Sequence, residues 1–202
     1  MKDWTGNNKP TFMCLGASNH SKHERADFDY YATDPIAAEL LLSVEPDLNN
    51  IWECACGEGH LAKVFDKYNK LGKASDLVNR GYGTQEDFLN NLFINFNTDF
   101  QGGGDIVTNP PYKYAKEFVL QALKIIAENK KVCMFLKLTF LEGKDRRKMF
   151  NEFPPKTIYV CSGRIKCALN GDFDATGQSA ACYAWFVWQK GFKGKPTIEW
   201  IN

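Results

Sequence analysis

The sequence predicts an α/β domain with a mostly parallel sheet and helices on both faces. The chain has 202 residues, of which 44% are hydrophobic, so it can form one packed domain but not two full ones. Short apolar segments of strand length alternate with segments of helical periodicity from about residue 33 to residue 189. Strands that alternate with helices are typical of parallel sheets. We place this domain at residues 29–202, without a separate target-recognition domain.

The N-terminal half is predicted to hold two strand–helix units after a polar arm. Residues 1–28 are rich in Gly, Asn, Ser and Lys without periodicity, and we interpret them as the arm. Thr33, Asp34 and Pro35 supply a cap and a first-turn proline for a helix over 37–44. The expected elements that follow are a strand at 50–54, a helix at about 60–71, a strand at 73–77 and a short patterned piece at 85–89.

The C-terminal half continues the alternation after three consecutive glycines. Its expected strands cover 105–108, 132–138, 157–161 and 181–189. Its expected helices cover about 114–129 and 144–151. Residues 163–179 are polar and are interpreted as a loop. Trp185 and Trp188 are expected to be core or face residues of the last strand.

Charge and composition restrict the function classes. The net charge is only +1, yet residues 130–166 hold ten Lys or Arg and three Asp or Glu. Such a basic band indicates either a face that binds a polyanion or a solvated helix face. No apolar run approaches the roughly 20 residues of a membrane helix, and the N-terminus has no signal-like stretch. We therefore expect a soluble cytoplasmic protein that does not bind membranes.

Seven cysteines are present, and none forms a CxxC pair. Zinc sites need paired ligands at regular spacing, and the three histidines do not complete such a set. We therefore predict no metal site and interpret the cysteines as reduced thiols, several of them in the core.

A glycine turn is predicted where the strand at 50–54 ends. Gly57 and Gly59 allow a tight turn and a close approach of a ligand, and a helix N-terminus follows them. Asp76 comes at the end of the next strand, where a carboxylate can accept hydrogen bonds from two ribose hydroxyls. The turn has neither a third glycine nor a GK[ST] sequence. This combination indicates an adenosine-containing ligand without pyrophosphate.

The sequence Thr-Asn-Pro-Pro-Tyr at 108–112 follows a buried strand. The two prolines stiffen the loop and fix the Asn109 carboxamide relative to Tyr112. This motif resembles that of class I S-adenosylmethionine-dependent methyltransferases, in the branch that methylates exocyclic amines. The resemblance covers about residues 29–190 and is most specific at 108–112.

The resemblance implies a Rossmann-like fold with a mostly parallel, seven-stranded sheet, and S-adenosylmethionine as cofactor. Residues 53–59 look like a variant of the family's D-P-x-C-G-S-G turn, although Cys54 and Glu58 depart from it, and Glu58 is left unassigned. Residues 87–89 resemble the D-F-L segment beside the cofactor adenine, and 31–35 resemble the segment near the cofactor's methionine end. The implied cofactor-binding residues are Tyr31, Thr33, Glu53, Ala55, Gly57, Gly59, Asp76, Asp87, Phe88 and Asn109.

The chemistry of an aromatic amine suggests how the motif acts. The exocyclic nitrogen of adenine shares its lone pair with the ring and is a poor nucleophile. The Asn109 side-chain oxygen and the Pro110 carbonyl are expected to accept its two N–H bonds and so direct the lone pair at the methyl group. Tyr112 is expected to offer a face on which a flipped base stacks. The predicted catalytic residues are therefore Asn109, Pro110 and Tyr112.

The C-terminal half resembles phage-type adenine methyltransferases in its arrangement. Lys137, Arg146, Arg147 and Arg164 are the predicted nucleic-acid-binding residues. The basic band favours adenine in DNA as the substrate. An RNA base amine and a protein glutamine amide remain alternatives, because the same motif serves enzymes that methylate amides and other amines. A non-catalytic nucleotide-binding module is a further alternative, which the intact motif at 109–112 disfavours, since pure binding needs no amine acceptor. The sequence makes no prediction of the oligomeric state.

Overall fold

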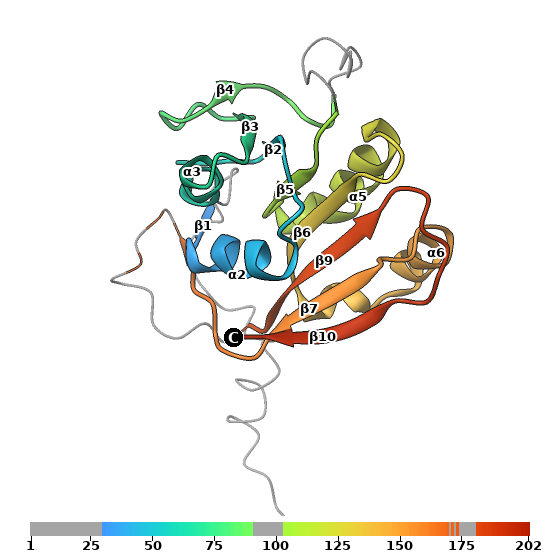
Figure 1. Ribbon diagram of the computed structural model, residues 1–202. Helices are drawn as coiled ribbons and strands as arrows, with labels where there is room; N and C mark the ends of the chain where they lie inside the picture. The colour runs from blue at the N-terminus through green and yellow to red at the C-terminus, as the bar shows by residue number, and fades with distance from the viewer. Residues whose placement is uncertain (1–29, 91–102, 170, 172, 174–180) are drawn as a thin grey trace, which may run out of the picture.

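The computed structural model describes residues 30–90, 103–169, 171, 173 and 181–202 (Figure 1). The predicted arm lies outside these residues, as does part of the predicted loop at 163–179. The strands are β1 (Tyr31–Thr33), β2 (Ile51–Glu53), β3 (Leu71–Asp76), β4 (Thr84–Gln85), β5 (Ile106–Thr108), β6 (Lys131–Lys137), β7 (Thr157–Cys161), β8 (Cys167–Leu169), β9 (Tyr183–Gln189) and β10 (Thr197–Ile201). The helices are α2 (Ile36–Val44), α3 (His60–Lys67), α5 (Ala115–Ile125) and α6 (Lys144–Glu152), with short 3-10 helices η1 (Tyr112–Tyr114) and η2 (Leu138–Leu141).

The main sheet has the strand order β10-β7-β9-β6-β5-β2-β3-β4. Neighbouring strands are parallel except where β9 runs antiparallel to β6 and β7. The predicted α/β class with a mostly parallel sheet is confirmed. The described sheet has eight strands rather than seven, because β10 adds a parallel edge strand beside β7.

Helices cover the two faces of the sheet (Figure 1), each over its own hydrophobic cluster. Helices α5 and α6 pack on one face, and α2 and α3 pack on the other. Trp188 lies in the first cluster and donates from Nε1 to the Phe153 carbonyl at 3.0 Å. Trp185 lies in the second cluster and donates to the Ala37 carbonyl at 2.8 Å. Both tryptophans are therefore core residues, as predicted.

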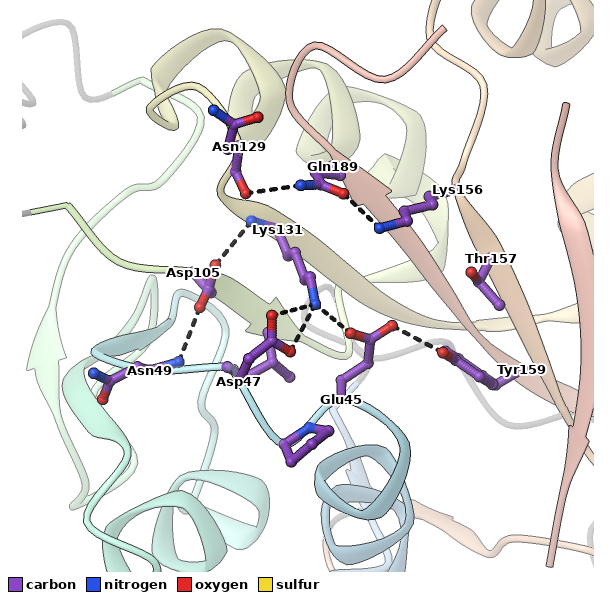
Figure 2. A network of polar contacts seen from close by, with 12 residues as sticks. Glu45, Asp47, Asn49, Asp105, Asn129, Lys131, Lys156, Thr157, Tyr159 and Gln189 are labelled. Carbon is purple, nitrogen blue, oxygen red and sulfur yellow. Dashed lines mark hydrogen bonds and ion pairs between the residues drawn. The ribbon is translucent and has the colours of Figure 1, made fainter. Parts of the chain in front are cut away.

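A buried polar network ties the start of β5 and β6 to the segment after α2 (Figure 2). Lys131 pairs with Glu45 and Asp47 through its ammonium, at 2.7 Å for Asp47 Oδ1. The carboxylate of Asp105 accepts hydrogen bonds from the backbone N–H groups of Asn49 and Lys131. These contacts lie at the amino ends of β5 and β6. The carboxyl ends of the strands, beyond which ligands bind in open α/β sheets, are at the opposite edge.

The described residues contain neither a group of three candidate metal ligands nor a helix long and apolar enough to span a membrane. The six cysteines among them are free thiols, of which Cys54, Cys56, Cys133 and Cys161 are buried.

Candidate functional site

The glycine turn stands at the point where the strand order changes direction. From β2 the chain continues outward to β3 and β4, whereas β5 and β6 lie on the other side of β2. In open α/β sheets, ligands bind beyond the carboxyl ends of the strands at such a point. Glu53 ends β2, Asp76 ends β3 and Asn109 follows β5, so the sheet brings these three predicted residues to one edge.

Asp76 connects the end of β3 to the glycine turn. Its Oδ2 accepts the Gly57 N–H at 2.8 Å, and its Oδ1 accepts the Val78 N–H at 2.9 Å. Gly57 and Gly59 have φ angles of 54° and 80°, a conformation that favours glycine. Each carboxylate oxygen has a further lone pair, so Asp76 can still accept a ligand hydroxyl.

Glu53 is only 2% exposed, and its Oε2 has no hydrogen-bond partner among the described residues. Burial, together with the negative charge of Asp76, raises the pKa of Glu53 well above its ordinary value. Burial therefore favours the neutral form of this carboxyl, which presents a donor as well as an acceptor.

Of the two polar atoms of the Asn109 carboxamide, only the nitrogen is hydrogen-bonded among the described residues. Its Nδ2 donates to Oγ1 of Thr33 at 2.7 Å, whereas its Oδ1 is buried and has no partner within the described part of the chain. Thr33 is itself fixed because β1 pairs antiparallel with β8, with Thr33 opposite Cys167. Pro110, the next residue, is buried. The fold therefore fixes an unsatisfied acceptor at the position predicted to receive an amine.

Tyr112 lies in a cluster of aromatic residues. Its ring centroid is 6.1 Å from that of Tyr31, and its hydroxyl donates to Tyr183 at 3.1 Å. The Lys137 ammonium stands 4.7 Å from the centroid of the Tyr112 ring. Burial raises the pKa of Tyr112, so its hydroxyl stays neutral. Lys137, predicted to bind nucleic acid with the basic band, thus lies directly against the loop that holds Asn109 and Tyr112.

A small polar cavity of about 20 Å³ lies between the turn, β1 and the Asn109 loop. That volume is roughly enough for one water molecule. Of the predicted site residues, those that line it are Tyr31, Thr33, Glu53, Ala55 and Asn109. A larger ligand therefore needs neighbouring side chains to move.

Two tyrosines that the sequence analysis missed cover the glycine turn. A Cβ at Gly57 would stand 2.1 Å from Cε2 of Tyr30, and a Cβ at Gly59 would stand 2.5 Å from Cδ1 of Tyr82. The Tyr30 hydroxyl accepts the Glu58 N–H at 3.1 Å and is hydrogen-bonded to Nδ1 of His60 at 3.1 Å. Tyr30 is the second residue after the predicted arm, and only its proximity to Tyr31 in the sequence could have indicated it.

Five predicted cofactor residues do not line the cavity: Gly57, Gly59, Asp76, Asp87 and Phe88. The Phe88 ring is buried in the core, 5.4 Å from Trp52 and 5.0 Å from Phe118 between ring centroids. The carboxylate of Asp87 accepts the N–H groups of Leu89 and Asn90. The side chain of Phe88 thus has a packing role, and Asp87 stabilises the turn after it.

The predicted basic residues differ in their surroundings. The Arg146 guanidinium donates to the carbonyls of Glu142 at 2.6 Å and Thr139 at 3.3 Å, so it holds the turn between η2 and α6. Arg164 donates to Sγ of Cys182 at 2.9 Å. Arg147 lines a groove beside α6.

Comparison with known proteins was informative only at the level of structure. No protein-family model and no curated protein matches the sequence. The chain is similar to a Listeria monocytogenes protein assigned as a class I S-adenosylmethionine-dependent methyltransferase, with TM-score 0.51 and 14% identity over 81% of this chain and 63% of that one. It is also similar to TrmN from Thermus thermophilus, with TM-score 0.50 and 16% identity over 77% and 48% of the two chains.

A third similar structure is that of a DrdV–DNA complex, with TM-score 0.50 and 13% identity over 98% of this chain and 31% of that one. The chain thus spans less than two thirds of the length of each of these three proteins. At these identities the likeness concerns the fold. The chain has the Rossmann-like fold found in class I S-adenosylmethionine-dependent methyltransferases.

Proposed function

We propose that this chain transfers a methyl group from S-adenosylmethionine to the exocyclic amine of adenine in DNA, giving N6-methyladenine. The observation that carries the proposal is the Asn109 carboxamide, whose Nδ2 donates to Thr33 and whose Oδ1 is buried without a partner among the described residues. A buried acceptor without a donor is costly unless a ligand satisfies it. An amine N–H is such a donor.

The residues at the carboxyl edge of the sheet fit the cofactor chemically. Asp76 offers carboxylate oxygens to ribose hydroxyls, and the Gly57 backbone permits a close approach once Tyr30 moves. Tyr31 and Thr33 border the cavity from β1. The bound cofactor supplies an electrophilic methyl group on a sulfonium centre.

The chain's own contribution is positioning and electrostatics. Asn109 Oδ1 accepts one N–H of the target amine, and the Pro110 carbonyl accepts the other, which draws the nitrogen toward tetrahedral geometry. These acceptors strengthen as the nitrogen becomes positive, so they favour the transition state over the ground state. The Thr33 contact keeps Oδ1, rather than Nδ2, directed at the amine.

Nucleic acid is supported as the substrate by charge. Residues 130–166 contain ten Lys or Arg and three Asp or Glu; Lys131 is buried in an ion pair, whereas Lys137 lies against the Tyr112 ring. A solved structure with a similar fold is a DNA complex of DrdV. These observations favour DNA over a protein amide.

Nucleoside mass spectrometry tests the proposal. The full chain is incubated with methyl-labelled S-adenosylmethionine and, separately, with DNA, RNA and protein, and each is digested after the reaction. We expect the label in N6-methyladenine from DNA, and far less label at the same time point with Asn109→Ala. Label only in an RNA base or a glutamine would contradict the assignment to DNA, and no label in any polymer would contradict the methyltransferase activity itself.

Calorimetry with S-adenosylhomocysteine tests the cofactor assignment separately. Asp76→Ala should bind it about 10- to 150-fold more weakly, because a hydrogen bond to a charged acceptor is worth about 1.5–3 kcal/mol. Circular dichroism controls for the turn that Asp76 also stabilises. Unchanged affinity in a folded variant would remove Asp76 from the cofactor site.

A further inference from the structure

A groove of about 410 Å³ beside α6 has no role in the mechanism described above. Its lining residues are Leu141, Gly143, Lys144, Arg147, Phe150 and Asn151. They come from the end of η2 and from one side of α6. The groove thus combines two apolar side chains with two cations.

The apolar part of the groove is attached to the core. Phe150 is half-buried, and its ring meets the Phe140 ring edge-on, with 5.8 Å between centroids. Phe140 in turn packs on Phe186 in the sheet, with 5.6 Å between centroids. Leu141 is 44% exposed beside it. A rigid apolar surface open to solvent is suited to the flat face of a ring.

Arg146 and Arg147 are neighbours in the sequence but not equivalent. The Arg146 guanidinium is hydrogen-bonded to two backbone carbonyls and lies 5.3 Å from the Phe140 ring centroid. Arg147 is exposed, and its guanidinium has no hydrogen-bond or ion-pair partner within the described ranges. Arg147 is therefore the arginine of this pair that is free to meet an anion.

The groove lies next to the catalytic loop along the chain. Lys137 ends β6 and lies against Tyr112, and η2 begins at the next residue and ends at Leu141. The segment 137–141 thus connects the Tyr112 contact to the groove.

We propose that this groove binds one nucleotide that flanks the target adenine, with the base on Leu141 and Phe150 and the phosphate on Arg147 and Lys144. The inference rests on the proposed function, because it takes nucleic acid as the substrate. A base and a phosphate together match an apolar surface bordered by cations. An acidic peptide would use the cations and leave the apolar surface uncovered.

The phosphate contact is tested by fluorescence anisotropy of a labelled adenine-containing oligonucleotide with the full chain, over a series of salt concentrations. Arg147→Gln should weaken binding several-fold at low salt and reduce the slope of log affinity against log salt by about 1. Lys148→Gln is the matched control, since it removes one positive charge from the same helix outside the groove. It should lose clearly less affinity. Equal losses in the two variants would overturn the phosphate contact.

The base contact is tested with oligonucleotides in which one abasic nucleotide is moved through the positions around the adenine. The wild type should lose about 5- to 150-fold in affinity at one flanking position, which corresponds to one stacked base. In Leu141→Ser that positional dependence should disappear while the salt slope is retained. A wild type that is indifferent to the abasic position, or that binds no oligonucleotide, would overturn the inference.

Failure of this inference is distinguishable from failure of the proposed function. Oligonucleotide affinity reports the groove, whereas N6-methyladenine formation reports Asn109. Melting temperatures within about 2 °C of the wild type show that the exposed substitutions leave the fold intact. If DNA is methylated but Arg147→Gln and Leu141→Ser bind as the wild type does, the groove assignment alone is wrong.

Discussion

Glu53 ends β2 inside the cavity with one carboxyl oxygen that has no partner among the described residues. Burial raises the pKa of Glu53 above the ordinary value of 4.5. The folded protein then holds this proton more tightly than the unfolded chain does. The contribution of Glu53 to stability is therefore fully present below about pH 4.5 and is lost as the pH rises toward the folded pKa.

We predict that Glu53→Gln removes this part of the pH dependence. The variant should match the wild type near pH 4 and exceed it at pH 8, by about 1 kcal/mol or about 2–4 °C in Tm. Urea and thermal unfolding at both pH values measure the difference. A stability difference that is constant between pH 4 and pH 8 would show that Glu53 ionises normally.

The Tyr30 hydroxyl accepts a hydrogen bond from the Glu58 N–H, a donor of the glycine turn that a ligand could use instead. Burial raises the pKa of Tyr30 to about 12, so its hydroxyl remains neutral. We predict that Tyr30→Phe binds S-adenosylhomocysteine about fivefold more tightly, because a competing hydrogen bond of about 1 kcal/mol is gone. Tyr82→Phe is the control, and calorimetry should find its affinity unchanged. Weaker binding by Tyr30→Phe would instead make the hydroxyl a ligand contact.

At the scale of elements, the Lys131 network in Figure 2 determines how β6 and β5 join the segment after α2. Burial alone would lower the pKa of Lys131, but its hydrogen bonds to Asp47 and Glu45 outweigh burial and raise it. The side chains of Lys131 and Glu45 are 11% and 8% exposed, whereas that of Asp47 is 69% exposed. The buried carboxylate of Glu45 therefore depends on the Lys131 ammonium, whereas the exposed carboxylate of Asp47 does not.

We predict that Lys131→Met destabilises the fold by about 3–5 kcal/mol, because it leaves the Glu45 carboxylate buried without its cation. Asp47→Asn should cost less than about 1 kcal/mol, since solvent screens an exposed ion pair. Urea denaturation compares the two variants. Equal and small losses would indicate that water replaces the ammonium at Glu45.

The strands that the sequence predicted include the two that are buried on both faces of the sheet. The predicted segments at 132–138 and 181–189 became β6 and β9, which pair over their full length in the centre of the sheet. β10 was missed although Ile198 and Trp200 alternate with polar residues, because this five-residue edge strand is defined by its pairing with β7 rather than by burial. β1 and β8 were missed because three-residue strands depend on a distant partner. Local sequence does not contain that information.

At the scale of the whole molecule, residues that follow strand ends were predictable because the parallel sheet brings them to one edge. Glu53, Asp76 and Asn109 illustrate this. The coverage of the glycine turn by Tyr30 and the difference between Arg146 and Arg147 were not predictable. Both depend on side-chain contacts between or within elements, which no spacing rule specifies.

The proposed chemistry depends on one side chain, Asn109, which two strands position. Asn109 directly follows β5, and Thr33, whose hydroxyl orients the Asn109 carboxamide, ends β1. If this orientation matters, Thr33→Val should slow methyl transfer although Thr33 accepts no proton in the reaction. Its loss should be smaller than that of Asn109→Ala, because the amide oxygen is still present in some orientations. Single-turnover rates with adenine-containing DNA compare the two. A Thr33→Val rate equal to that of the wild type would contradict a positioning role.

The most direct test of the central claim is single-turnover methylation by Asn109→Ala, measured as N6-methyladenine, with S-adenosylhomocysteine affinity measured in parallel. We expect the rate to fall about 100- to 1000-fold, as for the loss of one preorganised hydrogen-bonding group in a transition state, with cofactor affinity changed little. A wild-type rate in the Asn109→Ala variant would contradict the account.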